Sequence, residues 1–297
     1  MCLAIRNFVE RDEHGKDAKK ISATELCDSP LRRILKLKYW DSVTVDYSDY
    51  LWALLGSAVH FVLSLNKQSE VLTEHGCSIE GSNGYVLTMR PDRVNTKTKT
   101  LEDYKITSIW TFIHKKHEKE WEEQLNVYRL GLALKGIEVN HAYINAILRD
   151  HSKIKYIQEF ARGNREYPEI PFKKVPVKLW TFDVAKSFLN NRFILHTKTP
   201  MDETKCEPCT ARERWYHISQ YAVMKEGAKR STKNFDIPNM DEAPAVLKEV
   251  KKYMAEKGYS EPKYTIETRD EESTRCKYYC DFTNFCPYYK KFVPEGQ

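Results

Sequence analysis

Residues 70–107 contain three runs of strand-forming residues separated by two turns, and this order limits the folds that the chain can adopt. The runs are EVLTEHGCSIEG, GYVLTMRPDRVN and TLEDYKIT, and the turns are GSNG and NTKTKT. Such a series predicts an antiparallel meander. Because successive side chains of a strand point to opposite faces, Asp103 and Lys105 share one face and Glu102 lies on the other. Asp92, on the neighbouring strand, is expected beside Asp103.

Helices are expected before and after this meander in the sequence. Ser22 and Glu25 have the spacing of a capping box, so a helix should follow them and be interrupted or restarted near Pro30. Asp49 is expected to begin the helix YLWALLGSAVHFVLSLN, which is apolar around most of its circumference and should therefore be buried. The stretch HEKEWEEQLNVYRLGLALKG predicts an amphipathic helix that stops near Gly136.

The rest of the chain predicts further strands and helices, and a boundary near residue 200. HAYINAILRD and FKKVPVKLW are typical of strands, and TFDVAKSFLNNRFILHTK is typical of a helix. Beyond the boundary we expect a basic strand–turn–strand unit (QYAVMKEGAKRSTKNFD), a helix (DEAPAVLKEVKKYMAEKG) and a strand (PKYTIETRD). The chain is thus predicted to be an α/β protein, with a core of residues 1–200 and a basic, cysteine-rich region of residues 201–297 closing back on it.

Composition narrows the class of protein. The chain has 297 residues, of which 41% are hydrophobic and 30% charged, as in folded proteins. No apolar run is long enough to cross a bilayer, and the N-terminal residues lack a signal-peptide pattern, so no membrane partner and a cytoplasmic location are expected. The net charge of +6 suits an anionic partner or an ordinary basic surface.

The paired acids of the meander predict a metal site. Two carboxylates that converge on one point repel each other, and a divalent cation removes that repulsion. Oxygen ligands such as Asp92 and Asp103 favour Mg²⁺ or Mn²⁺. Lys105 could orient or deprotonate a water molecule, or stabilise charge on a phosphate. On the preceding predicted helix His60 shares a face with Gly56 and can offer a neutral nitrogen to a metal.

Four short motifs follow one another on the predicted helices and strands: Gly56-x-x-x-His60, Pro91-Asp92, Asp103-x-Lys105 and Gln124-x-x-x-Tyr128. In this order they resemble the motifs of the RecB-like branch of the PD-(D/E)xK nucleases, over roughly residues 22–150. The resemblance implies a mixed central sheet of the restriction-endonuclease type, flanked by helices, with residues 1–200 as the nuclease core. It also implies metal-dependent hydrolysis of DNA, with exonuclease action in recombination, repair or phage replication. Recombination or replication proteins, or a second copy of the chain, are further expected partners.

The same resemblance implies roles for individual residues. It implies a ligand set for the catalytic metal, namely His60, Asp92, Asp103 and the main-chain carbonyl of Ile106. It implies Lys105 as the catalytic lysine, positioned together with the nucleic-acid backbone by Gln124 and Tyr128. One departure is Arg90, which stands where a small residue such as glycine is expected before the Pro-Asp pair.

Each residue of these motifs could instead have a purely structural role. His60 could be a core histidine, and Asp92 could shape a turn. Asp103 and Lys105 could form a cross-strand salt bridge. Gln124 could be a solvated helix residue, and Tyr128 a core tyrosine. The protein as a whole could be an inactive nuclease-fold DNA-binding or recombination accessory protein. It could also be a structural subunit organised by a metal bound to its cysteines.

The chain has eight cysteines, and clustered cysteines in a cytosolic protein more often bind metal than form disulfides. Cys276, Cys280 and Cys286 lie close together in the sequence. They resemble the C-terminal trio that holds an iron–sulfur cluster in RecB-like nucleases such as AddB and the CRISPR adaptation exonucleases, with a first spacing one residue longer. The resemblance implies a [4Fe-4S] cluster completed by a distant cysteine, for which Cys209 is favoured over Cys27 and Cys206.

Alternatives for the cysteines are Zn²⁺ held by Cys206, Cys209 and two of the trio, or reduced thiols without metal. A bound metal would contribute folding free energy to the C-terminal region. Cys2 and Cys77 are expected to be structural or incidental. Arg32, Arg33 and the basic segment 225–233 are expected to supply salt-dependent affinity for DNA.

Overall fold

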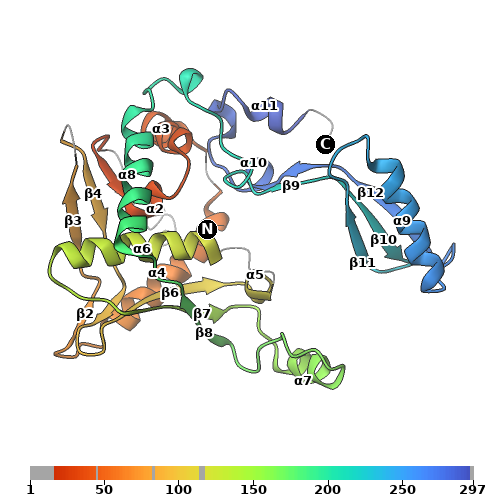
Figure 1. Cartoon of the computed structure of the whole chain (residues 1–297), viewed down its shortest axis with the longest axis horizontal. Coiled ribbons are helices and arrows are strands. Elements are labelled where there is room, and N and C mark those ends of the chain that lie inside the picture. Colours follow the sequence, from red (N-terminus) through yellow and green to blue (C-terminus); the bar gives the residue numbers. More distant parts are fainter. Residues whose placement is uncertain (1–16, 45, 82–83, 114–117, 295–297) are drawn as a thin grey trace. The chain divides into compact units, whose positions relative to one another are not determined.

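The structure, a computed structural model, describes residues 17–44, 46–81, 84–113 and 118–294 (Figure 1). Cys2 and part of the predicted GSNG turn lie outside these residues. The described residues form two compact units, one ending at Pro200 and the other beginning at Met201. Mixed sheets flanked by helices make up the chain, as expected for an α/β protein.

The first unit is built on a five-stranded sheet with the order β2-β5-β6-β7-β8. Its strands are β2 (Val71–Thr73), β5 (Arg93–Asn95), β6 (Thr100–Thr107), β7 (His141–Leu148) and β8 (Phe172–Val177). Strands β6 and β7 are parallel, and all other pairs are antiparallel. The NTKTKT turn joins β5 to β6 as predicted, so Arg93 pairs with Glu102.

A second sheet in this unit has the order β1-β4-β3, with strands β1 (Lys20–Ser22), β3 (Cys77–Glu80) and β4 (Val86–Met89). The predicted meander was therefore only partly right, because each of its first two runs breaks into two strands that join different sheets. The breaks fall after Thr73, where Glu74 has a φ of 49°, and at Pro91. A positive φ ends a strand, and proline interrupts its ladder of hydrogen bonds.

The capping box is confirmed. Ser22 Oγ accepts a hydrogen bond from the Glu25 N–H at 3.2 Å, and Ser22 N–H donates to Glu25 Oε2 at 3.1 Å. The short helix α2 (Ala23–Leu26) follows, and α3 (Pro30–Tyr39) restarts at the proline, which suits the first turn because its missing N–H needs no partner there.

Helix α6 (Glu118–Leu134) lies between the five-stranded sheet and α8 (Phe182–Lys198) (Figure 1). Its Leu125 and Leu132 are fully buried in the core of the unit. Gly136, with a φ of 77°, follows its end, as expected for a left-handed C-terminal stop. Two further helices were not predicted: α5 (Ile109–Ile113) and α7 (Lys153–Ala161).

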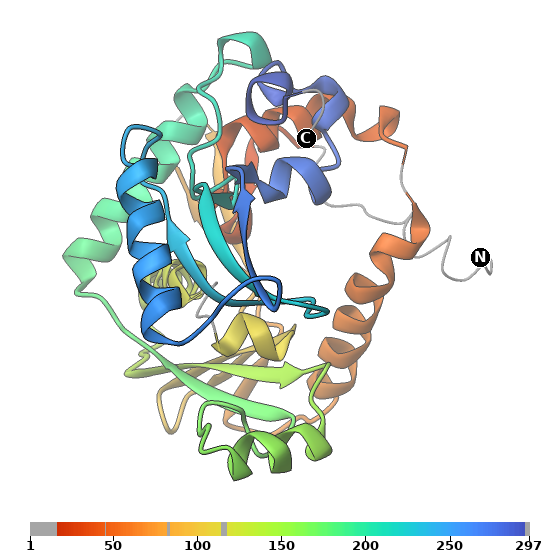
Figure 2. The same cartoon turned by 90° about the vertical axis from the view of Figure 1, so that its right-hand side faces the viewer.

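The expectation that the apolar helix is buried was wrong. Helix α4 (Leu51–Ser64) has no buried residue, and Phe61 and Val62 are 65% and 61% exposed. Within the first unit it contacts β6, and Figure 2 shows it in orange at the margin of the unit. One strand covers only one side of a helix, so the other apolar positions stay uncovered. The helix also begins at Leu51, because Asp49 lies in a preceding 3₁₀ turn capped by Asp46.

The second unit contains a three-stranded antiparallel sheet with β10 at its centre. Helix α9 packs on this sheet around Val223, Val250 and Met254, which confirms the predicted strand–turn–strand, helix and strand. The elements of the unit are β9 (Tyr216–His217), β10 (Gln220–Lys225), β11 (Ser231–Asp236), α9 (Ala243–Glu256), β12 (Tyr264–Arg269), β13 (Glu272–Ser273), α10 (Thr274–Tyr278) and α11 (Tyr289–Phe292). Among the described residues, no helix combines the length and apolar composition that a bilayer crossing requires.

One face of the main sheet is tied together by ion pairs around Glu102. This buried carboxylate contacts Arg93 on β5, and Lys174 on β8 at 2.6 Å. The Lys174 ammonium also lies 4.2 Å from the centre of the Tyr143 ring. Burial alone would raise the pKa of Glu102, but Lys174 and Arg93 outweigh it and hold that pKa below its usual value.

We expect Glu102→Gln to lower the stability of the protein at pH 7 by about 1–2 kcal/mol. This value is smaller than for a fully buried ion pair, because Lys174 is partly exposed and solvent screens its charge. Since the folded pKa is depressed, the stabilisation is present above the unfolded pKa and is lost as pH falls through the folded pKa. Thermal unfolding of both proteins at pH 7 and near pH 4 measures this difference. An equal gap at the two pH values would contradict the role assigned to the ion pairs.

Candidate metal centre

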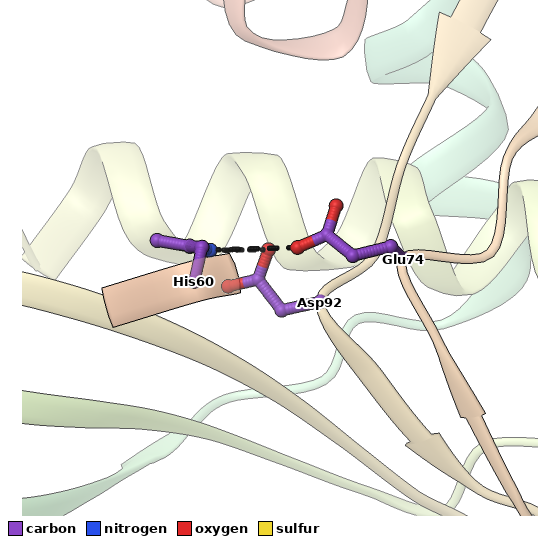
Figure 3. A group of neighbouring side chains, drawn as sticks. All are labelled: His60, Glu74 and Asp92. Carbon is purple, nitrogen blue, oxygen red and sulfur yellow. Dashed lines mark ion pairs between the residues drawn. The ribbon is translucent and has the colours of Figure 1, made fainter. Parts of the chain in front are cut away.

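His60, Glu74 and Asp92 come together from three separate segments (Figure 3). His60 Nδ1 lies 3.3 Å from Asp92 Oδ1 and 3.6 Å from Glu74 Oε1. Among the described residues, this is the one group of three potential metal ligands whose atoms all lie within 4.8 Å of one another. His60 comes from α4, Glu74 from the break after β2, and Asp92 from the residues just before β5.

Main-chain hydrogen bonds hold the two acids in place. The Glu74 N–H donates to the main-chain carbonyl of Asp92 at 3.0 Å. The Tyr104 N–H on β6 donates to Asp92 Oδ2 at 2.7 Å, which leaves Oδ1 directed toward His60. The rings of His60 and Tyr104 meet edge to face with 6.3 Å between centroids. The hydrogen bond from the main chain of β6 therefore fixes the orientation of the Asp92 carboxylate.

Asp103 and Lys105 share a face of β6, as strand alternation predicts, and form an ion pair with 2.7 Å between Nζ and Oδ2. Asp103 is only 2% exposed. Although Lys105 is close, Asp103 Oδ2 accepts no hydrogen bond of normal geometry. A buried carboxylate oxygen without a full hydrogen bond costs free energy, and a further positive group close to it would reduce that cost.

The titration behaviour of the site reflects crowded negative charge. A hydrogen bond from His60 to Asp92 raises the pKa of the imidazole, and this outweighs the opposing effect of burial. Burial, followed by the charge of Asp92, raises the pKa of Glu74. Burial also raises the pKa of Asp103, against the opposing charge of Lys105 and with a further increase from Asp92. Burial alone would lower the pKa of Lys105, but the charge of Asp103 and its hydrogen bond outweigh burial and raise that pKa.

The geometry fits a divalent cation. Metal–oxygen distances near 2.1 Å in an octahedral Mg²⁺ site place adjacent ligand atoms roughly 3 Å apart. The separations of 3.3 and 3.6 Å from His60 Nδ1 to Asp92 and Glu74 are close to this value. Glu74 was not predicted from the sequence. Asp103 lies near enough for its charge to act on His60, but its oxygens do not join the group of three.

The predicted pair on α6 is in contact. Gln124 Nε2 donates to the Tyr128 hydroxyl at 2.8 Å, as the spacing of one helical turn allows. Tyr128 is 6% exposed, and burial, followed by the charge of Asp103, raises its pKa. In the described part of the chain neither residue hydrogen bonds to Lys105. Ile106 lies next to Lys105 on β6.

The structure changes the interpretation of two basic residues. Arg33 is 5% exposed and donates hydrogen bonds to the main-chain carbonyls of Ala18 and Lys20, so it was wrongly expected to contact DNA. Arg32 forms an ion pair with Asp28 one turn before it on α3. By contrast, the segment of residues 225–233, which includes the turn between β10 and β11, exposes its basic side chains: Lys225, Lys229, Arg230 and Lys233.

The C-terminal cysteines all lie in the second unit. Burial, followed by the neighbouring thiols of Cys280 and Cys286, raises the pKa of Cys276 to about 11. The main-chain carbonyl of Cys209 accepts a hydrogen bond from Arg214 Nε at 3.1 Å, and the charge of Arg214 also acts on Cys276. These interactions bring the segment of Cys209 near that of the trio.

The other cysteines have ordinary packing roles or lie elsewhere. Cys206 is buried, and its thiol donates to the Asp202 carbonyl at 3.3 Å. Cys27 belongs to the first unit, where Cys77 packs against the core as expected. Among the described cysteines no three sulfur atoms lie within 4.8 Å of one another.

We expect His60 in EDTA-treated protein to titrate above its ordinary pKa of about 6.5, because its ring donates a hydrogen bond to Asp92. The pair then stabilises the metal-free fold below the unfolded pKa and loses this effect as pH rises through the folded pKa. NMR titration of the imidazole measures this, with Asp92→Asn expected to lower the midpoint and Glu74→Gln to lower it less. An equal decrease in the two variants would show that Asp92 is not the principal partner.

No family model matches the sequence, and no curated protein matches it. Among solved structures, the protein SSO0001 has 18% sequence identity and a TM-score of 0.41, over 69% of this chain and 88% of that one. A phage-related exonuclease from Haemophilus somnus 129PT has 11% identity and a TM-score of 0.36, over 58% of this chain and 89% of that one. Similarities this distant assign neither a family nor an activity.

Proposed function

We propose that the protein is a Mg²⁺- or Mn²⁺-dependent DNA nuclease with a restriction-endonuclease-like core. The observation that carries this proposal is the Asp103–Lys105 ion pair placed beside the group of His60, Glu74 and Asp92. The ordered motifs that resemble RecB-like nucleases support exonuclease action in recombination, repair or phage replication.

In this proposal His60, Asp92 and Glu74 hold the cation, with Asp103 and the carbonyl of Ile106 completing its ligands. A bound cation would lower the pKa of a coordinated water and polarise the scissile phosphate. The ammonium of Lys105 remains charged beside Asp103, so it is suited to orient the attacking water and to stabilise negative charge on the phosphate. Gln124 and Tyr128, which hydrogen bond to each other on α6, would position Lys105 and the nucleic-acid backbone.

We expect the protein to degrade DNA with Mg²⁺ or Mn²⁺ and to stop when EDTA is added. Lys105→Ala should lower the rate about 10²–10³-fold, the range for loss of one group that stabilises developing negative charge. Lys99→Ala is a matched control, because this exposed lysine also pairs with an acid, Glu138.

The binding of the ion is measured separately from activity. Electron paramagnetic resonance of Mn²⁺ should show binding retained in Lys105→Ala and weakened in Asp92→Asn and Glu74→Gln. A protein that binds DNA but neither cleaves it nor binds Mn²⁺ would instead be the inactive nuclease-fold accessory protein.

We propose further that Cys276, Cys280, Cys286 and Cys209 hold a [4Fe-4S] cluster that ties together separate segments of the second unit. The mutual effects of the trio on their pKa values support this, as does the link of Cys209 and Cys276 through Arg214.

Anaerobically purified protein is expected to be brown, with visible absorbance from thiolate-to-iron charge transfer. Cys209→Ser should reduce this absorbance, whereas Cys77→Ser, which changes a core cysteine of the first unit, should not. A colourless protein containing stoichiometric zinc would contradict the cluster. Equal loss of colour on changing Cys27 or Cys206, with none on changing Cys209, would reassign the fourth ligand.

A further inference from the structure

A cavity of about 480 Å³ lies directly beside the candidate metal centre. Its lining residues come from α4 and from the two strand breaks: Gly56, Ser57, His60, Phe61, Ser64, Glu74 and Arg90. His60 and Glu74 belong to the metal centre itself, so a molecule in the cavity would lie next to the bound ion. Ligand sites in proteins have volumes of this order.

Phe61 gives this cavity an exposed aromatic wall. It follows His60 on α4, and 65% of its surface is exposed. Apart from His60, the other α4 residues that line the cavity are small: Gly56, Ser57 and Ser64. At Gly56 an added Cβ would meet no atom within 4 Å, which shows that the space there is open. Because most of the Phe61 side chain is exposed, a flat ring can approach it.

Arg90 gives the same cavity a cation. Its side chain is 68% exposed, and its Nε lies 4.0 Å from Glu74 Oε2, at the limit of an ion pair. A guanidinium has five N–H donors, so one distant carboxylate leaves most of them for another anion. This residue departs from the nuclease motif, so the motif assigns it no role.

We propose that this cavity binds one nucleotide of the substrate strand, adjacent to the phosphate that is cleaved. Phe61 stacks on the base, and Arg90 binds the phosphate of that nucleotide. An aromatic ring and a guanidinium together match the two parts of a nucleotide, and base stacking on aromatic side chains does not depend on sequence. This subsite rests on the nuclease function proposed above.

The subsite selects a class of substrate. Inside a duplex both faces of a base are covered by neighbouring bases, so Phe61 can stack only on an unpaired base or on the outer face of a terminal pair. A single strand offers such a face at every base and a blunt duplex only at its ends, so single-stranded DNA should bind better than blunt duplex DNA.

The test measures DNA binding in the Lys105→Ala background with Mn²⁺, by fluorescence anisotropy of a labelled oligothymidylate and a labelled blunt hairpin. Phe61→Ala should weaken binding of the single strand about 5- to 150-fold, the range for loss of one stacked base. Val62→Ala is the matched control, since Val62 lies next to Phe61 on α4, is 61% exposed and does not line the cavity.

Arg90→Ala should weaken single-strand binding and lower the slope of log affinity against log salt by about 0.7, as for one lost phosphate contact. Lys97→Ala is its control, because Lys97 is 71% exposed and pairs with Glu70 at 3.6 Å. Mn²⁺ binding should be unchanged in Arg90→Ala. Weakened Mn²⁺ binding with an unchanged salt slope would show that Arg90 only positions Glu74, and would overturn its assignment.

Equal effects of Phe61→Ala and Val62→Ala, or tighter binding of the blunt hairpin, would overturn the subsite. This failure is distinct from failure of the proposed function. A protein that cleaves DNA while Phe61→Ala binds normally keeps the nuclease and loses the subsite. A protein that never cleaves DNA but needs Phe61 to bind it loses the nuclease and keeps a single-strand binding site.

Discussion

The candidate metal centre depends on holding three carboxylates, those of Glu74, Asp92 and Asp103, close together although their charges repel. Main-chain hydrogen bonds from β6 and from the break after β2 fix Asp92 against Glu74 and His60. The positive partners include the imidazole of His60, the ammonium of Lys105 and, 4.0 Å from Glu74, the guanidinium of Arg90. The raised pKa values of Glu74 and Asp103 show that negative charge at this point is still costly. A divalent cation bound among these groups would remove that cost.

Most of the secondary structure follows from local sequence rules, whereas the pairing of strands does not. The capping box at Ser22, the stop at Gly136 and the alternation on β6 are each set by a few neighbouring residues. The division of residues 71–95 between two sheets depends on strands far away in the chain, including β1. For the same reason Glu74 could not be predicted as a partner of His60. Its one local signal is an acid that interrupts a strand before a glycine.

Helix α4 shows that an apolar sequence does not always predict a buried helix. An apolar circumference predicts burial, yet α4 contacts one strand and leaves Phe61 and Val62 exposed. It places His60 in the candidate metal centre and Phe61 in the adjoining cavity. In the proposed function, neighbouring positions on one helix would thus join the chemistry of the ion to recognition of the DNA strand.

The proposed chemistry requires a divalent ion bound between α4 and the two strand breaks. Anomalous X-ray diffraction from crystals grown with Mn²⁺ tests this directly. We expect one strong manganese peak within bonding distance, about 2.1–2.2 Å, of His60 and of the carboxylates of Asp92 and Glu74. Crystals with no peak at these residues at saturating Mn²⁺, or with the ion bound only elsewhere on the chain, would contradict this metal centre and the nuclease chemistry built on it.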